Sequence, residues 1–393
     1  MKNNIVKSNV AVVFGGRSVE HDISIITGVQ TLNALDKQKY NILPIYLNKE
    51  GRFLTSNSFF NIKTFSNDKF LYNDTKLKQL TFGFDGWLYL YKNKKLVKFK
   101  KIDFVFLATH GGEGENGSLQ GYLDICSIPY SSSNCLSSAI CMNKLITKQI
   151  LEQNNICITK YVCISQKEYT KNSKCYLDKI RSLKFPLIVK PCNLGSSIGI
   201  NFCKTKTEIK NALSFAFLFD EDVLIEEAVE NLREVNVSIM GNKFNFECSD
   251  IEEIVLTKDF LTFENKYMNK ESSSKGMGNA SRNIPANLSV ELKEKVLELA
   301  SKAFVACLCS GIVRIDFLIN SKTNEVFLNE INTIPGSLSN YLWNARKYNF
   351  SKILDQVKKY SLENFDSKKS KVKNFSTSVL SQFETSKKLK LSK

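Results

Sequence analysis

The sequence predicts an α/β fold that begins with a doubly wound, parallel-sheet domain. Short apolar runs rich in β-forming residues at 10–14, 40–46 and 102–108 are expected to be strands. Helical patterns at 22–35 and 118–126 follow the first and the last of these runs, and a glycine-rich turn leads into each helix. Strands that alternate with helices in this way form βαβ units, whose ligands bind at the carboxyl ends of the strands.

Two further units are expected after the first, which should cover residues 1–130. The second unit, 131–222, is built around a tight glycine loop, and the third, 223–366, contains a long amphipathic helix between strands. The remaining tail, 367–393, is rich in lysine and serine and is expected to be disordered. The expected helices in these units are 143–153, 206–218, 290–309, 341–347 and 351–361, and the other expected strands are 87–91, 96–99, 161–164, 185–190, 198–202, 223–227, 234–240, 313–319 and 325–328.

The composition is that of an ordinary globular protein inside the cell. Of the 393 residues, 43% are hydrophobic and 24% are charged. No apolar run approaches the roughly 18 residues that a membrane helix needs, and the polar start leads into a strand rather than into a signal-peptide core. We therefore expect a cytoplasmic protein without a membrane partner.

The eleven cysteines are expected to stay reduced and mostly buried, because no export signal precedes them. No two cysteines have C-x-x-C spacing, and the closest pair, Cys307 and Cys309, lies in an apolar helical stretch. Since the chain has only two histidines, a zinc site built from cysteine and histidine is not expected.

The formal net charge of +16 does not by itself indicate a nucleic-acid-binding protein. Residues 366–393 alone hold eight lysines against one aspartate and one glutamate, a net charge of +6. The other positive charges are spread along the chain, and no basic stretch is interleaved with aromatic residues that could stack on bases. We expect a lysine-rich, solvated surface that attracts anionic substrates, and no nucleic-acid partner.

Two motifs carry residue types that suit a nucleotide. Lys190 ends an apolar strand and precedes a glycine–serine turn at 192–199, where an ammonium, backbone amides and hydroxyls can bind phosphate oxygens. This is not a Walker loop, because no Gly-Lys-Ser/Thr opens a helix. Glu226 and Glu227 end the next strand, with Glu234 beyond them, and can accept hydrogen bonds from an adenine amine and a ribose. Taken alone, these motifs also fit a β-turn with a surface lysine and a solvated charge pair.

Two other motifs suit a metal ion and a substrate amine. Asp316, Glu330 and Asn332 lie on two neighbouring expected strands and offer the oxygen ligands that Mg²⁺ takes together with phosphate oxygens. Arg314 could stabilise a negatively charged intermediate, and a buried Arg–Asp pair is the structural alternative. Glu20 follows a glycine turn at the start of the first helix, where it could hold an ammonium or be an ordinary helix-start acid.

In this order, the motifs resemble those of the D-alanine–D-alanine ligase family over roughly residues 10–345. The resemblance implies the ATP-grasp fold, in which a two-subdomain α+β module follows the parallel-sheet domain. It also implies an ATP-dependent ligase that joins two D-alanines through a D-alanyl phosphate for peptidoglycan precursor synthesis, with two Mg²⁺ or Mn²⁺ ions and as a homodimer. The signatures are FGGRSVEHDIS at 14–24, ATHGGEGENGSLQG at 108–121, MNK at 142–144, KPCNLGSSIGI at 190–200, RIDF at 314–317 and LNEINTIPG at 328–336.

The resemblance also implies a role for each residue that matches a family motif. Glu20 would bind the first D-alanine ammonium, and Arg314 with the backbone of Gly336 would stabilise the oxyanion. Ser196 and Tyr267 would form hydrogen bonds that close a loop over the site. ATP would be bound by Lys144, Lys190, Ser197, Glu226, Glu227, Val229 and Glu234, the metal ions by Asp316, Glu330 and Asn332, and the two substrates also by His110, Lys266, Ser337 and Ser339.

The chain departs from the family pattern in ways that bear on the acceptor. Asn116 and Asn143 stand where the family usually has aspartate. The segment after Gly336, which binds the second carboxylate in the family, is shorter by a few residues, and the polar segment 269–283 is longer than the usual loop. D-serine, D-lactate or another amino acid is therefore an alternative acceptor, and a non-catalytic ATP-binding relative is a further alternative.

Overall fold

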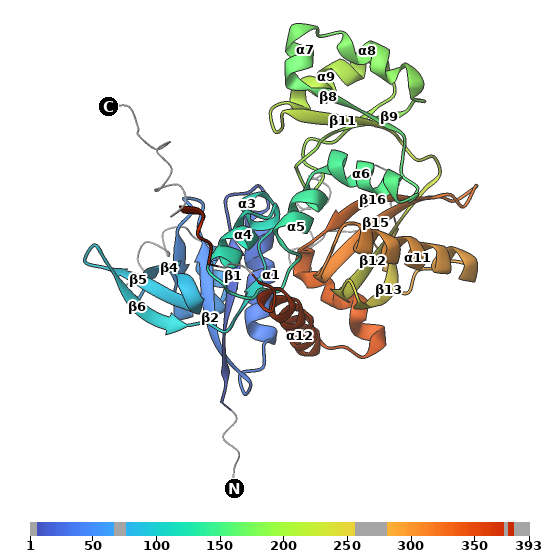
Figure 1. Cartoon of the computed structure of the whole chain (residues 1–393). Helices are drawn as coiled ribbons and strands as arrows, with labels where there is room; N and C mark the ends of the chain where they lie inside the picture. Colours follow the sequence, from blue (N-terminus) through green and yellow to red (C-terminus); the bar gives the residue numbers. More distant parts are fainter. Residues whose placement is uncertain (1–5, 67–75, 256–280, 373–375, 381–393) are drawn as a thin grey trace, which may run out of the picture.

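The computed structural model describes residues 6–66, 76–255, 281–372 and 376–380, which form three β-sheets with helices around them (Figure 1). Lys266 and Tyr267 lie outside the described residues. Among the described helices, none has the length and apolar character needed to cross a membrane.

The N-terminal sheet has seven strands in the order β6-β5-β4-β3-β2-β1-β7. The strands β1, β2 and β7 pair in parallel, which confirms the parallel-sheet region predicted from the sequence. An antiparallel meander from β3 to β6 widens the sheet and includes the predicted hairpin β5–β6. The elements are β1 (Ser8–Gly15), α1 (His21–Ala34), β2 (Tyr40–Leu47), β3 (Phe53–Thr55), η1 (Asn57–Phe60), η2 (Ile62–Phe65), β4 (Lys78–Phe82), η3 (Phe84–Gly86), β5 (Trp87–Lys92), β6 (Lys95–Lys101), β7 (Phe104–Leu107), α3 (Gly112–Glu115) and α4 (Ser118–Ile125).

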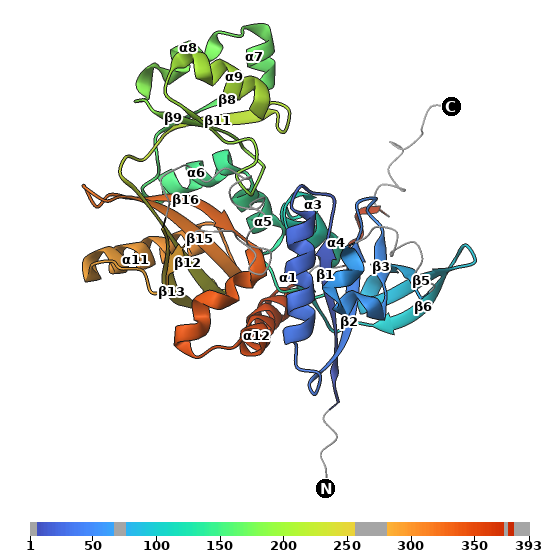
Figure 2. The same ribbon diagram turned by 180° about the vertical axis from the view of Figure 1, so that it is seen from behind.

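The middle sheet is antiparallel, with the strand order β10-β9-β11-β8. Together with α7, α8 and α9 it stands apart from the other two sheets, and α6 lies below it, as both views show (Figures 1 and 2). The elements here are α5 (Cys135–Met142), α6 (Lys144–Gln153), β8 (Tyr161–Ser165), α7 (Gln166–Lys171), α8 (Cys175–Lys179), η4 (Ile180–Ser182), β9 (Leu187–Pro191), β10 (Asn201–Cys203), α9 (Lys206–Ala216) and β11 (Asp222–Glu227).

The third sheet is also antiparallel and has the order β14-β13-β12-β15-β16. The sequence did not predict β13, whose residues mix acids with apolar side chains. The final helix α12 continues to Lys369 and so enters the segment that was expected to be a disordered tail. The elements are β12 (Leu232–Asn242), β13 (Asn245–Val255), β14 (Ser281–Asn283), α11 (Val290–Ala306), β15 (Gly311–Asn320), β16 (Val326–Asn332), η5 (Gly336–Arg346) and α12 (Phe350–Lys369).

The expected boundary at 222/223 separates strands that in fact pair. β11 hydrogen-bonds to β8 and β9 and is therefore part of the middle sheet. The helices that open the expected second unit pack elsewhere: Cys141 of α5 and Leu151 of α6 belong to the apolar core of the third sheet. Likewise Trp343 of η5 and Leu354 of α12 are buried in the core of the N-terminal domain. At both ends of the second and third expected units, residues thus pack with a different sheet from the one expected from their place in the sequence.

Strand alternation gives the third sheet one apolar and one polar face. Val235 and Val237 of β12 are buried with Phe304 of α11 in the core of this sheet. The residues between them point to the other face. There, Asn236 pairs in register with Glu252 on β13 and with Asp316 on β15, and Asp316 pairs with Glu330 on β16. Because directly opposed residues share a face, a row of polar side chains crosses four strands.

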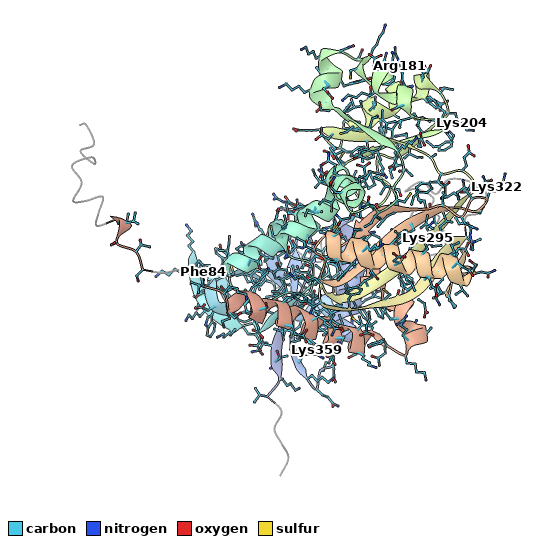
Figure 3. The ribbon with its side chains drawn as sticks, turned by 45° about the vertical axis from the view of Figure 1, so that its right-hand side comes forward. Phe84, Arg181, Lys204, Lys295, Lys322 and Lys359 are labelled. Atoms are coloured by element: carbon cyan, nitrogen blue, oxygen red, sulfur yellow. The ribbon has the colours of Figure 1, made fainter. Side chains whose placement is uncertain are left out.

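The positive charge is spread over the surface, as the sequence predicted. Exposed cations are found on separate parts of the molecule, including α11, the turn after β15 and α12 (Figure 3). The figure labels five of them, Arg181, Lys204, Lys295, Lys322 and Lys359.

Candidate functional site

Lys190 and Glu226 leave the same face of the middle sheet and form a buried ion pair. Lys190 pairs in register with Leu224, two residues before Glu226, so both side chains point the same way. Nζ of Lys190 contacts Oε1 of Glu226, and Nζ of Lys148 lies 2.8 Å from Oε2. Burial alone would raise the pKa of Glu226, but Lys148 and Lys190 outweigh it and lower the pKa to about 2. Glu226 is therefore ionised between two lysines.

Lys190 also connects the middle sheet to the third sheet. Its ammonium donates to Oδ1 of Asn329 at 3.3 Å, and Asn329 immediately precedes Glu330 on β16. The lysine expected at the phosphates and the carboxylate expected at the metal thus come from facing sheets.

Lys144 holds the glycine loop that follows β9. Its ammonium donates to the carbonyl of Leu194, and its backbone N–H donates to the carbonyl of Cys192 at 2.9 Å. Asn143 caps α6 by accepting from the N–H of Ile146 at 3.0 Å, and its side-chain amide donates to Oδ1 of Asn193 at 2.9 Å. The carboxylate of an aspartate has no N–H for that second bond, which gives the asparagine at this position a physical reason.

Glu20 and Ser196 are brought into direct contact, because Oγ of Ser196 donates to Oε1 of Glu20. Ser196 has a φ of 54°, in the left-handed region that few residues other than glycine adopt. Two loops enclose the carboxylate closely: a Cβ on Gly111 would lie 2.6 Å from Oε2 of Glu20, and one on Gly195 would lie 2.8 Å from it. Gly111 also has a φ of 63°, in the left-handed region, so this position favours glycine for its backbone as well.

Three carboxylates lie close together, and the charge of Glu330 raises the pKa of the other two, Glu20 and Glu115. Burial raises the pKa of Glu20, the Ser196 hydrogen bond lowers it, and the charge of Glu330 raises it again. Burial and the charge of Glu20 raise the pKa of Glu115 to about 7, against hydrogen bonds from the N–H groups of Gly111 and Ile334. A carboxyl group that titrates near neutral pH between two other acids is typical of a functional site.

His110 is buried and uncharged at neutral pH, because burial lowers its pKa to about 4. Its Nε2 lies 2.8 Å from Oγ1 of Thr27 on α1, which also accepts the N–H of Ser337 at 3.0 Å. His110 is thereby linked through Thr27 to the segment that follows Gly336. This link joins helix α1, the second signature and the expected acceptor segment.

Arg314 and Asp316 form a two-bond ion pair on β15. Nε and Nη2 of Arg314 donate to the two carboxylate oxygens of Asp316, each at 2.7 Å. Nδ2 of Asn332 lies 3.1 Å from Oδ2 of Asp316 and 3.5 Å from Oε1 of Glu330. The Arg–Asp ion pair that was expected as the alternative to a functional site is thus present. The side chain of Asn332 also lies within hydrogen-bond distance of the two other expected metal ligands, Asp316 and Glu330.

Glu227 is separated from Glu226. The two alternate on β11, and Glu227 accepts the N–H of Lys184 at 2.9 Å on the other face. Val229 and Glu234 are half-buried at the end of β11 and on β12, and Ser197 is half-buried in the glycine loop.

The segment after Gly336 turns sharply, with left-handed φ angles of 51° at Ser337 and 48° at Ser339. Ser337 is half-buried, whereas Ser339 is fully buried, and its Oγ has no hydrogen-bond partner among the described residues. Ser339 therefore does not present its hydroxyl to solvent in this conformation.

The sequence analysis did not identify several residues of the site. Lys148 stands one helical turn after Lys144, a spacing that puts both on one face of α6 and could have signalled it. Glu115 lies inside a recognised signature. No sequence signal pointed to Arg282, which lies in the segment read as a polar insertion. Its Nε is 3.3 Å from Oε1 of Glu252, at the end of the polar row on the third sheet.

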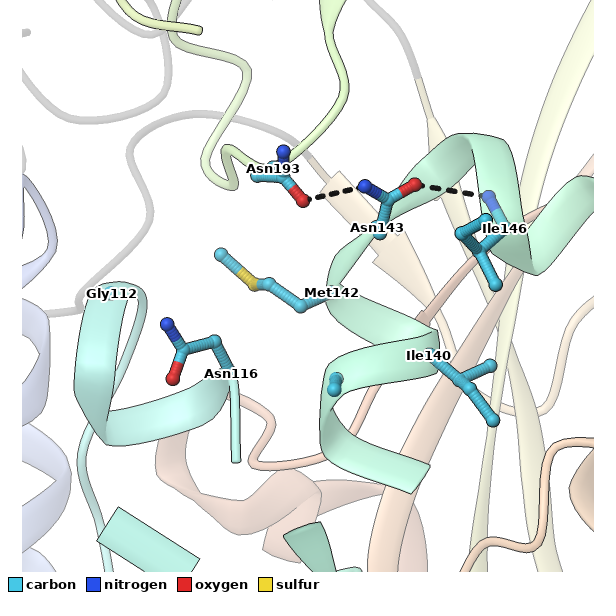
Figure 4. Close-up of a pocket in the computed structure, with 8 residues that line it drawn as sticks. Gly112, Asn116, Ile140, Met142, Asn143, Ile146 and Asn193 are labelled. Atoms are coloured by element: carbon cyan, nitrogen blue, oxygen red, sulfur yellow. Dashed lines mark hydrogen bonds between the residues drawn. The ribbon is translucent and has the colours of Figure 1, made fainter. Parts of the chain in front are cut away.

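A cavity of about 440 Å³ lies beside the glycine loop, between α3 and the α5–α6 turn (Figure 4). Both asparagines that depart from the family pattern, Asn116 and Asn143, line it, and the Asn143–Asn193 hydrogen bond lies at its edge. None of the eight lining residues has a charged side chain. The lining residues are Gly112, Asn116, Ala139, Ile140, Met142, Asn143, Ile146 and Asn193.

The donor set on β15 and β16 fits a hard divalent cation. Among the described residues, no three His, Cys, Asp or Glu side chains form a metal cluster. The expected set has only two carboxylates, Asp316 and Glu330, with the amide of Asn332. That number suits Mg²⁺, which keeps waters and phosphate oxygens as its other ligands.

Two family models match the chain, one after the other. The model described as "D-ala D-ala ligase N-terminus" matches residues 9–133, and the model described as "D-ala D-ala ligase C-terminus" matches residues 150–358. The D-alanine–D-alanine ligase of Thermosipho africanus is 39% identical over 371 residues, which cover 94% of this chain and 98% of that one.

Solved structures are similar over nearly the whole chain. The D-alanine–D-alanine ligase of Coxiella burnetii has a TM-score of 0.77 at 26% identity, covering 96% of this chain and 98% of that one. The VanG D-Ala:D-Ser ligase of Enterococcus faecalis has a TM-score of 0.76 at 26% identity, covering 91% and 100%. The similarity thus extends to ligases that are named for different acceptors, D-alanine and D-serine.

Proposed function

The chain belongs to the D-alanine–D-alanine ligase family, a family of ATP-dependent ligases, and we propose that it joins two D-alanines through a D-alanyl phosphate. The observation that carries this proposal is the contact of Glu20 with Ser196, within electrostatic reach of Lys144 and Arg314. It combines an acid for a substrate ammonium with cations for phosphate and oxyanion. The dipeptide would enter peptidoglycan precursor synthesis.

ATP binding is assigned to the facing surfaces of the middle and third sheets. Lys144 and Lys190 bind phosphate oxygens, helped by Ser197 in the glycine loop. Glu226 is assigned to the adenine amine, and it lies on the same face of the middle sheet as Lys190. Glu227, Val229 and Glu234 complete the adenine and ribose contacts, although the side chain of Glu227 faces away from that of Glu226.

The first chemical step needs a carboxylate to approach a triphosphate. Glu20 binds the ammonium of the first D-alanine, which orients its carboxylate oxygen for in-line attack on the γ-phosphorus. The bond from the γ-phosphorus to the β-phosphate oxygen breaks, and ADP is the leaving group. Lys144 and Lys190 offset the repulsion between the two anions. The second amine then attacks the acyl carbon, phosphate leaves, and Arg314 with the N–H of Gly336 stabilises the oxyanion.

Asp316, Glu330 and Asn332 would hold two Mg²⁺ or Mn²⁺ ions. When bound, such ions supply positive charge at the β- and γ-phosphate oxygens. Arg314 holds Asp316 by two hydrogen bonds, which fixes the orientation of this ligand.

The second substrate is assigned as D-alanine, with D-serine, D-lactate or another amino acid as the alternative. Ser337 is better exposed than Ser339 to bind its carboxylate, and His110 supports Ser337 through Thr27. Lys266 and Tyr267 are expected to take part, with Tyr267 bonded to Ser196. The protein is further proposed to be a cytoplasmic homodimer.

The test measures phosphate release from MgATP with a panel of D- and L-amino acids and D-lactate, and identifies each product by mass. D-alanyl-D-alanine as the main product supports the proposal, and a different main product replaces the acceptor. ATP turnover without a ligated product, or no turnover, refutes the proposal. Glu20→Gln should raise the KM for D-alanine, whereas Glu113→Gln, an exposed acid paired with Arg17, is the matched control.

A further inference from the structure

Lys148 is a buried lysine for which the proposed reaction has no use. It projects from α6, one turn after Lys144, and its side chain is 2% exposed. Its ammonium lies 2.8 Å from Oε2 of Glu226, 3.0 Å from Oγ1 of Thr159 and 5.3 Å above the ring of Tyr161. Burying a lysine this deeply is unfavourable unless its charge is matched, so the position calls for an explanation.

Glu226 uses its two oxygens for two different cations. Oε1 contacts Lys190, while Oε2 receives Lys148 and the hydroxyl of Thr159, which donates at 3.0 Å. The two lysines come from different elements, Lys190 from β9 and Lys148 from α6. One carboxylate therefore stands between two ammonium groups, and the buried group as a whole carries a net charge of +1.

This arrangement has a consequence when ATP arrives. If the protein binds ATP as proposed above, Lys190 must turn from Glu226 toward the phosphates, so the inference rests on the proposed function. If Lys190 were the only partner, its departure would leave a buried carboxylate without a counter-charge. Glu226 would then either retain Lys190, in competition with ATP, or take up a proton and change its hydrogen bonding to the adenine amine.

We infer that Lys148 is a positioning residue, which holds Glu226 ionised and in place so that Lys190 is released to the phosphates of ATP. Thr159 supports the same oxygen and fixes the direction of the carboxylate. The Lys148 ammonium does not touch the nucleotide. Its effect reaches ATP through Glu226 and Lys190.

The other groups that act on this pair do not replace Lys148. Glu152, on the same helix, favours the charged form of Lys148, but it is an acid and cannot neutralise Glu226. Asn329 from β16 accepts from Lys190 at 3.3 Å and is neutral. The cations that face Glu226 among the described residues are thus Lys148 and Lys190.

The test compares Lys148→Met, which keeps length without charge, with Lys148→Arg, which keeps charge. ATP affinity is measured by calorimetry and by the KM for ATP at saturating D-alanine. Lys148→Met should raise the KM for ATP roughly 10- to 100-fold and leave the KM for D-alanine within about twofold. Lys148→Arg should recover most of the affinity. Lys179→Met, which removes a more exposed ion pair with Glu168 between α8 and α7, is the control.

A pH series separates this role from a merely structural one. In the Lys148→Met variant, Glu226 should become protonated as pH falls from 8 to 6, and this should release Lys190. The Kd of the variant for ATP, divided by the Kd of the wild type, should therefore fall with pH. In the Glu226→Gln background, adding Lys148→Met should change ATP affinity by less than about twofold, because no carboxylate is left to hold Lys190.

Several results would overturn the inference: an unchanged KM for ATP in Lys148→Met, equal losses for the methionine and arginine variants, or a Kd ratio independent of pH. If Lys148→Met does not fold, the comparison of Glu226→Gln with Lys148→Met/Glu226→Gln, where no buried carboxylate is stranded, carries the test. A wild type that binds no ATP and makes no peptide refutes the proposed function instead, so the two failures are distinct.

Discussion

Replacing Glu115 by glutamine should reverse the order of stability between variant and wild type as pH rises. Burial and neighbouring acids raise the pKa of Glu115 from an ordinary 4.5 to about 7. At about 1.4 kcal/mol per pKa unit, this difference in pKa changes the free energy of unfolding by about 3 kcal/mol between low and high pH. Because the pKa is higher in the folded protein than in the unfolded chain, the folded protein has this extra stability below pH 4.5 and loses it as pH rises through 7. Above pH 7 the folded protein holds a charged, buried carboxylate at that cost.

Glutamine carries no charge, so only the wild type should lose this free energy with pH. The amide has one acceptor oxygen where Glu115 accepts from two N–H groups, those of Gly111 at 3.0 Å and Ile334 at 3.3 Å. One buried N–H therefore loses its acceptor, which costs about 1 kcal/mol at every pH. The variant should be about 1 kcal/mol less stable than the wild type near pH 4.5 and about 2 kcal/mol more stable at pH 8.

The assay is urea unfolding of both proteins at pH 5, 6, 7 and 8, without nucleotide. Glu113→Gln is the matched control, because Glu113 is 44% exposed and pairs with Arg17, itself 57% exposed. Its stability should differ from the wild type by less than about 1 kcal/mol at each pH, as is usual for surface ion pairs. A constant difference between Glu115→Gln and wild type would refute the reasoning, since it would mean that Glu115 does not titrate near neutral pH.

Three further predictions concern the metal ligands, the core and the tail. Glu330→Gln should lower kcat roughly 10²-fold or more, because it removes a metal-binding charge. The melting temperature without nucleotide should hold or rise, because Glu20 and Glu115 lose a like-charged neighbour. A near-normal kcat would show that Glu330 is not a metal ligand. Trp343→Ala should cost about 3–5 kcal/mol in urea unfolding, because the indole is fully buried and donates to Ser238 at 3.2 Å; a loss below about 1 kcal/mol would contradict this. Truncation after Ser367 should leave specific activity nearly unchanged, because the described residues removed are exposed, and a large loss in a folded protein would assign the tail a role.

The sequence was informative wherever chemistry and strand periodicity coincide. Arg314 and Asp316 are two residues apart on one strand, as are Glu330 and Asn332 on the next, so alternation puts each pair on one face. Antiparallel pairing then places Asp316 opposite Glu330. Such pairs can be recognised in one sequence because both members belong to one short motif.

Contacts between distant segments were harder to predict. β11 pairs with β8 and β9, yet nothing in its apolar sequence shows which sheet it joins. Trp343 belongs to the same apolar core as β1 and β7, which are more than 200 residues away in the sequence, because the buried apolar surface of η5 has no directional preference that a sequence displays. The contacts of Lys148 and Thr27 were also missed, since each side chain acts on a residue from another element.

The acids of the site give a physical reason for its ligands to be cations. Burial raises the pKa of Glu20 and of Glu115, and the charge of Glu330 raises both further, while Lys144 and Arg314 only partly compensate at Glu20. A site in this state favours binding of positive charge, because an added cation lowers the free energy of all three carboxylates at once. The ammonium of an amino acid beside Glu20 and divalent ions beside Glu330 are cations of this kind. On the opposite sheet Glu226 lies between two lysines, so there the favoured ligand is an anion, the triphosphate. In the proposed function, amino acid and nucleotide would therefore bind on opposite sides of one site by the same electrostatic rule, and the carboxylate to be phosphorylated would lie between them.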